Sequence, residues 1–465
     1  MRLLCIHGHF YQPPREDPFT GQIPKERGAA PFHDWNERIL AECYAPNARQ
    51  GNFAKISFDI GPTLMTWLQG HAPSTYRRIL FDDRVNHERY GAGNAIAQAY
   101  NHTILPLATP ADKNLQVRWG IADFRHRFGR PPQGMWLPET AVDTETLECL
   151  AAHDIAFTIL APWQAGGTEA PDVTVPYRVN LPSGHSIVVF FYQQSLSGSV
   201  SFDPDTTANA DAFIRDSVLP HYPSNNGHDP LILVASDGEL YGHHQPWRDK
   251  FLAYLLNTSP NMADLAVTYP ARYLQHHPVG HTIEIREQTS WSCHHGVERW
   301  RGDCGCCPGD GSWKGHLRAG LDRLATAFDE LFDDLWQARG VDPHDVRLGY
   351  AGVLLGKQTP DEFVRDRAQR SLGESEARRA SLMLEALYQR HRMYTSCGFF
   401  FDDPSGLEAR YNIAAAARVV DLVDQVMGIS LESDLLPSLR QVHSSKTGET
   451  GEDIYLDTLV VHHRR

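Results

Sequence analysis

Two acidic residues follow apolar stretches of strand length at distant positions in the chain. Glu139 ends the sequence GMWLPE, and Asp237 directly follows the run LILVAS. Cleavage of a glycosidic bond requires one carboxylate that attacks or stabilises the anomeric carbon and another that protonates the leaving oxygen. Glu139 and Asp237 are therefore predicted to form a catalytic pair. The alternatives are a solvated acid before the next helix for Glu139 and a turn residue before glycine for Asp237.

Histidines and aromatic residues surround these positions in the sequence. In IHGHFYQPP, His7 and His9 are two residues apart, so an extended strand places both side chains on one face, where they suit one sugar or one metal. They and Gln12 are predicted to bind a polar substrate. The tryptophans can cover the apolar face of a pyranose or belong to the core; the candidates are Trp136, Trp163, Trp291 and Trp300.

The sequence SDGELYGHH carries further polar groups beside Asp237. Glu239 is predicted to be a partner of Asp237 rather than the catalyst, and His243 and His244 are predicted to contact a sugar hydroxyl or a catalytic carboxylate. In YNHTILPL, His102 precedes another apolar run and joins the predicted substrate-binding residues.

Apolar runs of strand length recur through the first 275 residues. They are Leu3–His7, Ile56–Ile60, Ile104–Leu107, Gln133–Leu137, Ala156–Leu160, Ile187–Phe191, Leu231–Ala235 and Ala266–Tyr269. Helix-like segments at Asp112–Phe128, Asp143–His153 and Ala208–Leu219 lie between them, and this alternation predicts an α/β fold with a parallel sheet. Functional groups in such folds gather at the carboxyl ends of the strands, where the polar residues above are found.

After Trp313 the pattern changes to apolar residues at helical spacing. Leu317, Leu321, Leu324 and Phe328 begin the first such stripe, and two more follow around 382–388 and 419–427. We therefore predict an α/β domain over residues 1–314 and an α-helical domain over residues 315–465, packed against the first.

Composition excludes several classes of function. The chain has 43 basic and 57 acidic residues and a net charge of −14, with no basic run interleaved with aromatics, so nucleic acid is not an expected partner. It has no apolar run long enough to cross a membrane and no signal-like start, so a soluble cytoplasmic protein is expected.

Four cysteines crowd into one short segment, SWSCHHGVERWRGDCGCC. Cys293, Cys304, Cys306 and Cys307, with His294 and His295 beside the first, offer enough ligands for a zinc ion. A redox-sensitive disulfide and a reduced glycine-rich loop remain alternatives.

The motifs HGHFYQP, YNHTILPL, GMWLPE and SDGELYGHH, in this order, resemble those of glycoside hydrolase family 57. The resemblance implies an incomplete (β/α)7 barrel followed by a helical domain, and a retaining hydrolase or transglycosylase acting on α-linked glucan without a cofactor. It implies that Glu139 is the nucleophile, Asp237 the acid/base, and that His7, His9 and His102 line the sugar site. Phe10 and Tyr11 interrupt the usual first motif, which indicates an atypical branch.

Two rival interpretations follow from the same residues. A metal-dependent polysaccharide deacetylase would use His7, His9 and Asp237 or His243 as ligands to a metal that activates water. A non-catalytic glucan-binding protein would keep the substrate contacts without turnover.

Overall fold

The computed structural model describes residues 1–465 except 225–228, 259–263, 369–370 and 464–465. The chain divides into two compact units. The first comprises Met1–Gln12, Lys25–Tyr100 and Phe124–His294, and the second Pro13–Pro24, Asn101–Asp123 and His295–Arg465. The predicted boundary between residues 314 and 315 falls inside the second unit and stays a prediction about domains.

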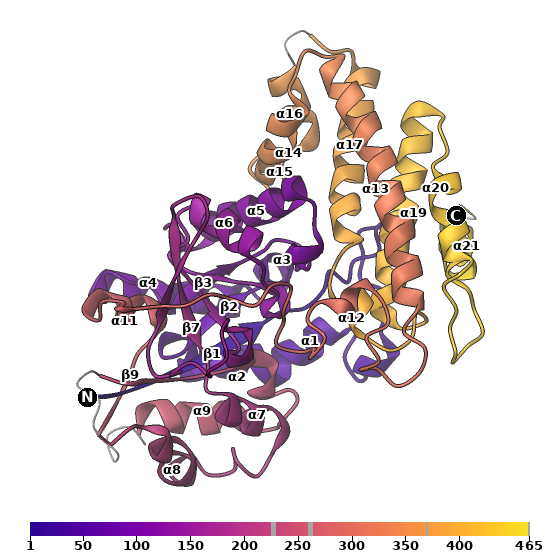
Figure 1. Cartoon of the computed structure of the whole chain (residues 1–465). Helices are drawn as coiled ribbons and strands as arrows, with labels where there is room; N and C mark the ends of the chain where they lie inside the picture. Colours follow the sequence, from indigo (N-terminus) through magenta and orange to yellow (C-terminus); the bar gives the residue numbers. More distant parts are fainter. Residues whose placement is uncertain (225–228, 259–263, 369–370, 464–465) are drawn as a thin grey trace. The chain divides into compact units, whose positions relative to one another are not determined.

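The first unit is built on two sheets of mainly parallel strands (Figure 1). The larger has the order β4-β3-β2-β1-β8 with β9 also pairing with β1, and the smaller has the order β10-β6-β7-β5. Within them only the β6–β7 pair is antiparallel among the described residues. The strands are β1 (Arg2–Phe10), β2 (Ser57–Ile60), β3 (Ala95–Gln98), β4 (Met135–Trp136), β5 (Phe157–Leu160), β6 (Tyr177–Asn180), β7 (Ser186–Phe191), β8 (Leu231–Asp237), β9 (Leu265–Val267) and β10 (His281–Thr282).

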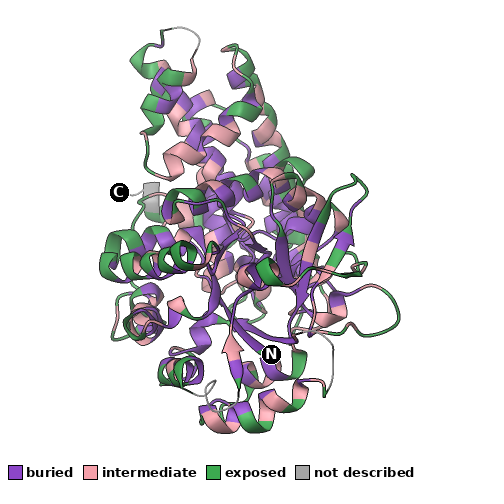
Figure 2. Ribbon diagram, turned by 90° about the vertical axis from the view of Figure 1, so that its left-hand side faces the viewer, coloured by how far each residue is buried: buried purple, intermediate pink, exposed green. Residues whose placement is uncertain are grey.

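The strands of the larger sheet are mostly apolar because successive residues, which point to opposite faces, are buried along them. Figure 2 shows such buried strands in purple. All but one of the predicted runs fall on strands. The prediction for Ile104–Leu107 is wrong: Leu105–Leu107 form a 3-10 helix around Pro106, which has no N–H to give to a ladder. The apolar runs missed three strands, β3, β6 and β10; the sequence of β3, AIAQ, is short and made of mostly small residues. The fold is mixed α/β with a parallel sheet, and the ladders of the described residues form no closed barrel.

Helices connect these strands. Asp143 caps α6, because its Oδ1 accepts a hydrogen bond from the Thr146 amide at 2.7 Å. The predicted helix over Ala208–Leu219 is irregular, with one α-helical turn followed by π and 3-10 segments up to His221. The α-helices up to residue 276 are α1 (Trp35–Ile39), α2 (Ala45–Gln50), α3 (Pro62–His71), α4 (Pro73–Tyr90), α5 (Pro110–Phe128), α6 (Thr144–Ala152), α7 (Gln194–Phe202), α8 (Ala210–Ala212), α9 (Arg248–Asn257) and α11 (Pro270–His276).

The second unit is predominantly α-helical. The predicted stripe of α13 is buried, as are those of α17 and α19; α17 packs against α19, and α13 against α20 (Figure 1). The helices after residue 297 are α12 (Glu298–Arg301), α13 (Trp313–Gln337), α14 (Pro343–Gly349), α15 (Ala351–Leu354), α16 (Pro360–Arg367), α17 (Glu374–Arg392), α18 (Cys397–Phe400), α19 (Leu407–Met427), α20 (Glu432–Leu439) and α21 (Gly451–His463). None of the described helices is long and apolar enough to cross a membrane.

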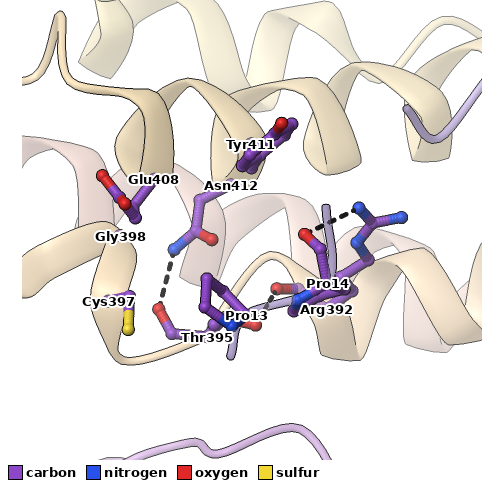
Figure 3. Close-up of a pocket in the computed structure, with 9 residues that line it drawn as sticks. All are labelled: Pro13, Pro14, Arg392, Thr395, Cys397, Gly398, Glu408, Tyr411 and Asn412. Atoms are coloured by element: carbon purple, nitrogen blue, oxygen red, sulfur yellow. Dashed lines mark hydrogen bonds between the residues drawn. The ribbon is translucent and has the colours of Figure 1, made fainter. Parts of the chain in front are cut away.

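An N-terminal segment belongs to this helical unit. The Arg392 guanidinium donates a hydrogen bond to the Pro14 carbonyl at 3.2 Å, and the Asn412 amide donates to the Thr395 carbonyl at 3.0 Å (Figure 3). The pocket between Pro13, Pro14 and these side chains has a volume of about 10 Å³. That is room for about one water molecule, so we assign this contact to structure rather than to substrate binding.

Candidate active site

Three polar side chains lie side by side where neighbouring strands of the first unit end. In the parallel register, His9 of β1 pairs with Asp59 of β2 on one side and with Asp237 of β8 on the other. Register partners in a parallel sheet point to the same face. The fold therefore gathers an imidazole and two carboxylates from positions 9, 59 and 237 at one edge.

Asp59 is the centre of a hydrogen-bond network. Its Oδ2 lies 2.8 Å from His9 Nδ1 and accepts a hydrogen bond from Gln98 Nε2 at 2.8 Å, and its Oδ1 lies 3.1 Å from His7 Nε2. Asp59 and Gln98 were not predicted from sequence. The available signal was a carboxylate inside the apolar run ISFDI, since a buried charge needs a partner.

His7 lies behind His9, away from solvent. Its side chain is fully buried, and its Nδ1 lies 2.9 Å from Ser57 Oγ. Trp136 stacks on both imidazoles, with ring centroids 4.8 Å from His7 and 5.0 Å from His9. In this conformation His7 and Trp136 hold the His9–Asp59 pair and expose no surface to a sugar, which differs from the direct substrate contact predicted for both.

The backbone at Glu139 is held in an unusual conformation. Glu139 has φ 58° and Thr140 φ 48°, both in the left-handed region that non-glycine residues rarely adopt. The buried Gln164 fixes this turn, because its amide donates to the Thr140 carbonyl at 2.8 Å and its Oε1 accepts from Thr140 Oγ1 at 2.9 Å. Local strain of this kind gathers at functional sites, and here it sets the direction of one half-buried carboxylate.

The Glu139 carboxylate accepts two hydrogen bonds on the same oxygen. Ser292 Oγ donates to Oε2 at 2.8 Å and Trp291 Nε1 donates to Oε2 at 3.1 Å. Neither donor uses Oε1. Ser292 was not singled out in the sequence, where it is hidden beside the cysteines of the same loop.

Asp237 and Glu239 have opposite environments although they are two residues apart. The Asp237 side chain is exposed. Glu239 is buried, and its Oε1 accepts hydrogen bonds from Tyr44 Oη at 2.7 Å and from the Tyr11 amide at 3.1 Å. Glu239 therefore supports the loop, while Asp237 is the acid that a substrate can reach.

The insertion of Phe10 and Tyr11 into the first motif has a structural role. Phe10 is fully buried, and a Cβ added to Gly238 would lie 2.3 Å from the Phe10 ring. Only glycine fits beside this ring, and Gly238 begins the 3-10 turn that follows Asp237. The Tyr11 amide then reaches Glu239, and Gln12 follows half-buried, its carbonyl accepting a hydrogen bond from Thr63 Oγ1 at 3.0 Å.

Charge is concentrated around His9. Burial lowers the pKa of His9, but the charges of Asp59, Asp237 and Glu239 outweigh burial and raise it to about 9. Burial and the charge of Asp237 raise the pKa of Glu239 to about 7. His9 is thus a cation at neutral pH, held among three carboxyl groups.

The two predicted catalytic acids also influence each other. Burial, and to a smaller degree the charge of Asp237, raise the pKa of Glu139, against the hydrogen bond from Ser292. Desolvation by the surrounding protein raises the pKa of Asp237, although this residue is exposed. The positive charges of His9 and His244 oppose this rise. The charge of Asp237 acts on Glu139, so the two carboxyl groups lie within range of electrostatic interaction.

The histidines after Asp237 differ in their contacts. His243 Nδ1 lies 2.5 Å from Glu42 Oε2, and the His243 ring meets Trp35 edge to face at 5.8 Å. His244 is exposed, and the charge of Asp237 opposes the lowering of its pKa by burial. The charge of Asp237 thus acts on His244, and the predicted role of His244 in substrate binding stays a prediction.

Two predicted site residues belong to the second unit. His102 Nδ1 lies 2.6 Å from Ser396 Oγ, and its backbone has φ 54°. Trp300 is fully buried, its ring lies 6.3 Å from that of Phe400, and its carbonyl accepts a hydrogen bond from Arg318 Nε at 2.8 Å. Trp300 is thus a core residue of that unit, and the sugar-binding role of His102 stays a prediction.

Comparison with known proteins identifies two regions of the chain. Residues 66–289 match the sequence model of glycosyl hydrolase family 57, and residues 310–463 match a domain of unknown function, DUF3536. Over 249 residues, 49% of this chain, the sequence is 23% identical to alpha-amylase 1 of Dictyoglomus thermophilum. The match spans only a third of that relative, 33% of its length.

Solved structures share the fold over nearly the whole chain. An exo-type maltose-forming amylase from Pyrococcus sp. ST04 superposes with a TM-score of 0.75 at 14% identity, covering 98% of this chain and 88% of the other. A GH57-type branching enzyme from Pyrococcus horikoshii gives a TM-score of 0.59 at 14% identity, covering 98% and 93%. At this identity the likeness establishes the mixed α/β fold with its many helices.

Proposed function

We propose that this chain, whose residues 66–289 belong to glycosyl hydrolase family 57, cleaves or transfers α-linked glucan by double displacement. The observation that carries the proposal is the pairing of Glu139, bonded through one oxygen only, with the exposed Asp237 within electrostatic range. Two such carboxyl groups are the minimum that retaining glycosidases need.

In the first step Glu139 is the nucleophile. Its Oε1 forms a bond to the anomeric carbon while the bond to the leaving oxygen breaks, and Asp237 gives its proton to that oxygen. A protonated Asp237 suits this step, because its raised pKa increases the fraction that carries a proton. The products are a glycosyl-enzyme ester and a shortened glucan.

In the second step Asp237 acts as a base. It takes a proton from water or from a sugar hydroxyl, whose oxygen attacks the anomeric carbon and releases Glu139 with retained configuration. Water gives hydrolysis, and the hydroxyl of a second oligosaccharide gives transfer.

The hydrogen bonds to Glu139 divide its two oxygens between support and attack. Ser292 and Trp291 hold Oε2 and stabilise the ionised form that a nucleophile needs, against the burial that raises its pKa. Gln164 fixes the left-handed turn at positions 139 and 140. This turn helps to direct Glu139 Oε1 toward the anomeric carbon.

The network of His7, His9 and Asp59 supports this mechanism over the deacetylase alternative. Both nitrogens of His7 are engaged with Ser57 and Asp59, so His7 has no nitrogen left for a metal, and His9 Nδ1 is engaged with Asp59. Its cationic His9 beside Asp237 instead stabilises the carboxylate form of the acid/base between the two steps.

The proposal also includes a specific form of the α/β fold, the incomplete (β/α)7 barrel. Two isolated links support it: a bridge between Gly134 and Phe157 joins β4 to β5, and the Gln193 amide donates to the Leu233 carbonyl at 2.7 Å beside β7 and β8. With these links the strands β8, β1, β2, β3, β4, β5 and β7 follow one another around a single core.

Incubation with maltooligosaccharides of several lengths tests the proposal. We expect shorter products from hydrolysis or longer ones from transfer, with retained anomeric configuration in either case. Glu139→Gln should lower kcat by at least about a thousandfold. The control is Glu88→Gln, at an exposed position of α4, which should keep wild-type rates. Inverted products, an active Glu139→Gln enzyme, or binding without turnover would contradict the proposal.

A further inference from the structure

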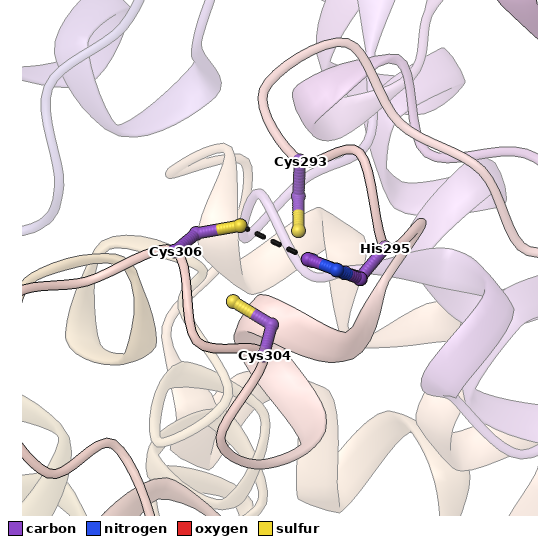
Figure 4. A group of neighbouring side chains, drawn as sticks. All are labelled: Cys293, His295, Cys304 and Cys306. Atoms are coloured by element: carbon purple, nitrogen blue, oxygen red, sulfur yellow. Dashed lines mark hydrogen bonds between the residues drawn. The ribbon is translucent and has the colours of Figure 1, made fainter.

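One loop gathers four side chains that have the chemistry of metal ligands. Cys293, His295, Cys304 and Cys306 lie within fourteen consecutive positions, 293–306, and their ligand atoms are all within 4.8 Å of one another (Figure 4). His295 Nδ1 lies 3.2 Å from Cys306 Sγ. It is the one such group found among the described residues.

We propose that these four residues bind one zinc ion in a tetrahedral site. Three thiolates and one imidazole are a common structural zinc set, with Zn–S bonds of about 2.3 Å and Zn–N bonds of about 2.0 Å. In a tetrahedron with those bond lengths, the ligand atoms lie roughly 3.7 Å apart. That is about 1 Å less than the limit of 4.8 Å within which they lie from one another in this structure. Three of the four side chains are half-buried or exposed, so rotamer changes can close that gap.

Two neighbours of the same types are left out of the group. Cys307 follows Cys306, yet its Sγ accepts a hydrogen bond from Lys314 Nζ at 3.4 Å and lies 4.0 Å from the Phe400 carbonyl. His294 precedes His295 and is exposed. The geometry thus selects four ligands from the six cysteines and histidines of this loop. The two that are left out, Cys307 and His294, are matched control positions.

The position of the site suggests what the metal does, a step that rests on the proposed function. Cys293 directly follows Trp291 and Ser292, the two donors to Glu139 Oε2. Four protein ligands leave zinc no open position for water or substrate. The ion would therefore anchor the end of the loop that positions these donors, and it would take no part in bond cleavage.

Metal analysis of the purified full chain tests the site. We expect about one zinc per chain in the wild type and in the controls Cys307→Ser and His294→Gln, and at least tenfold less after dialysis in Cys304→Ser and Cys306→Ser. Cobalt reconstitution should give the thiolate charge-transfer absorption of a tetrahedral site, absent from Cys306→Ser. Iron in place of zinc, a disulfide among the three cysteines by mass, or equal metal loss in Cys307→Ser would overturn the proposal.

Activity provides the second, separable readout. Removing zinc should lower kcat on a maltooligosaccharide more than it changes KM, and added zinc should restore it. If the chain bound about one zinc ion but its activity did not depend on that zinc, the anchoring role would be overturned. Because metal content is measured without turnover, an enzyme inactive on glucans could still confirm or refute the zinc site.

Discussion

Two histidine-containing groups in this molecule have similar residue types and opposite organisation. In the group of His7, His9 and Asp59, a fully buried carboxylate occupies the imidazole nitrogens at 2.8 and 3.1 Å. In the group of Cys293, His295, Cys304 and Cys306, the ligand atoms converge on one another in a partly exposed loop.

The difference shows what makes a metal site. Histidines two residues apart on a strand were compatible with a metal or with a sugar, and the neighbouring strand adds a carboxylate that engages one nitrogen of each imidazole. The second group gathers three thiols and an imidazole within 4.8 Å of one another and contains no carboxylate. We therefore expect the first group to be a source of rigidity and charge, and the second to depend on an ion.

The largest expected effect on stability comes from removing Asp59. Asp59→Ala leaves the buried His9 cation without its partner and should lower the free energy of unfolding by about 3–5 kcal/mol. Urea denaturation measures it. The control Asp361→Ala breaks an exposed ion pair with Arg365 and should cost far less. A loss below about 1 kcal/mol at Asp59 would show that the network is not structural.

Glu239 should make stability fall with rising pH. Its pKa is raised from 4.5 to about 7 in the folded chain, so in that window the native state holds a proton that the unfolded state has lost. Stability from this group is complete below pH 4.5 and is lost as the pH rises through about 7. Glu239→Gln should flatten the decline by on the order of 3 kcal/mol, measured by urea denaturation across the window. If the free energy of unfolding of variant and wild type changed with pH in parallel, the raised pKa of Glu239 would be contradicted.

Ser292 should affect turnover more than binding. Ser292→Ala removes the shorter hydrogen bond to Glu139 Oε2, so the pKa of the carboxyl group rises and less of it is ionised. We expect kcat to fall about tenfold, or about 1.4 kcal/mol, with KM little changed and the acidic limb of the rate profile moved to higher pH. The control Ser183→Ala removes an exposed hydroxyl that donates a hydrogen bond to Glu148. An unmoved pH profile would assign Ser292 to loop packing alone.

The smallest effect is expected at Ser57. Ser57→Ala removes the hydroxyl next to His7 Nδ1, two bonds away from Asp59 in the network, and should cost about 1 kcal/mol of unfolding free energy without changing metal content. Thermal or urea unfolding measures it. A loss as large as that of Asp59→Ala would mean that the imidazole of His7, rather than the carboxylate, is the centre of the network.

The sequence predicted what is local and missed what depends on register. Apolar runs located most strands, and with them the strand-end positions of His9 and Asp237. Asp59 was concealed because a single acid inside a buried run carries no periodic signal, and only the pairing of β1 with β2 brings it to His9. The apolar run at residues 104–107 was misassigned because Pro106 favours a 3-10 turn over a ladder.

The site itself was predicted by residue type and refined by burial. Histidines, tryptophans and acids were expected to face a substrate, yet His7 and Trp136 are fully buried and Trp300 lies in the helical core. Burial of this kind follows from side chains that meet across strands, which local spacing does not encode. Ser292 gave no signal, because a serine acquires its role only from the left-handed turn that brings Glu139 to it.

The most direct test of the central claim is capture of the covalent intermediate. Incubation with an activated 5-fluoro-α-glucosyl fluoride, followed by proteolysis and mass spectrometry, should find the fluoroglucosyl group on the peptide that contains Glu139, and none after Glu139→Gln. A label on any other residue, or steady turnover of this reagent to product of inverted configuration, would contradict double displacement through Glu139.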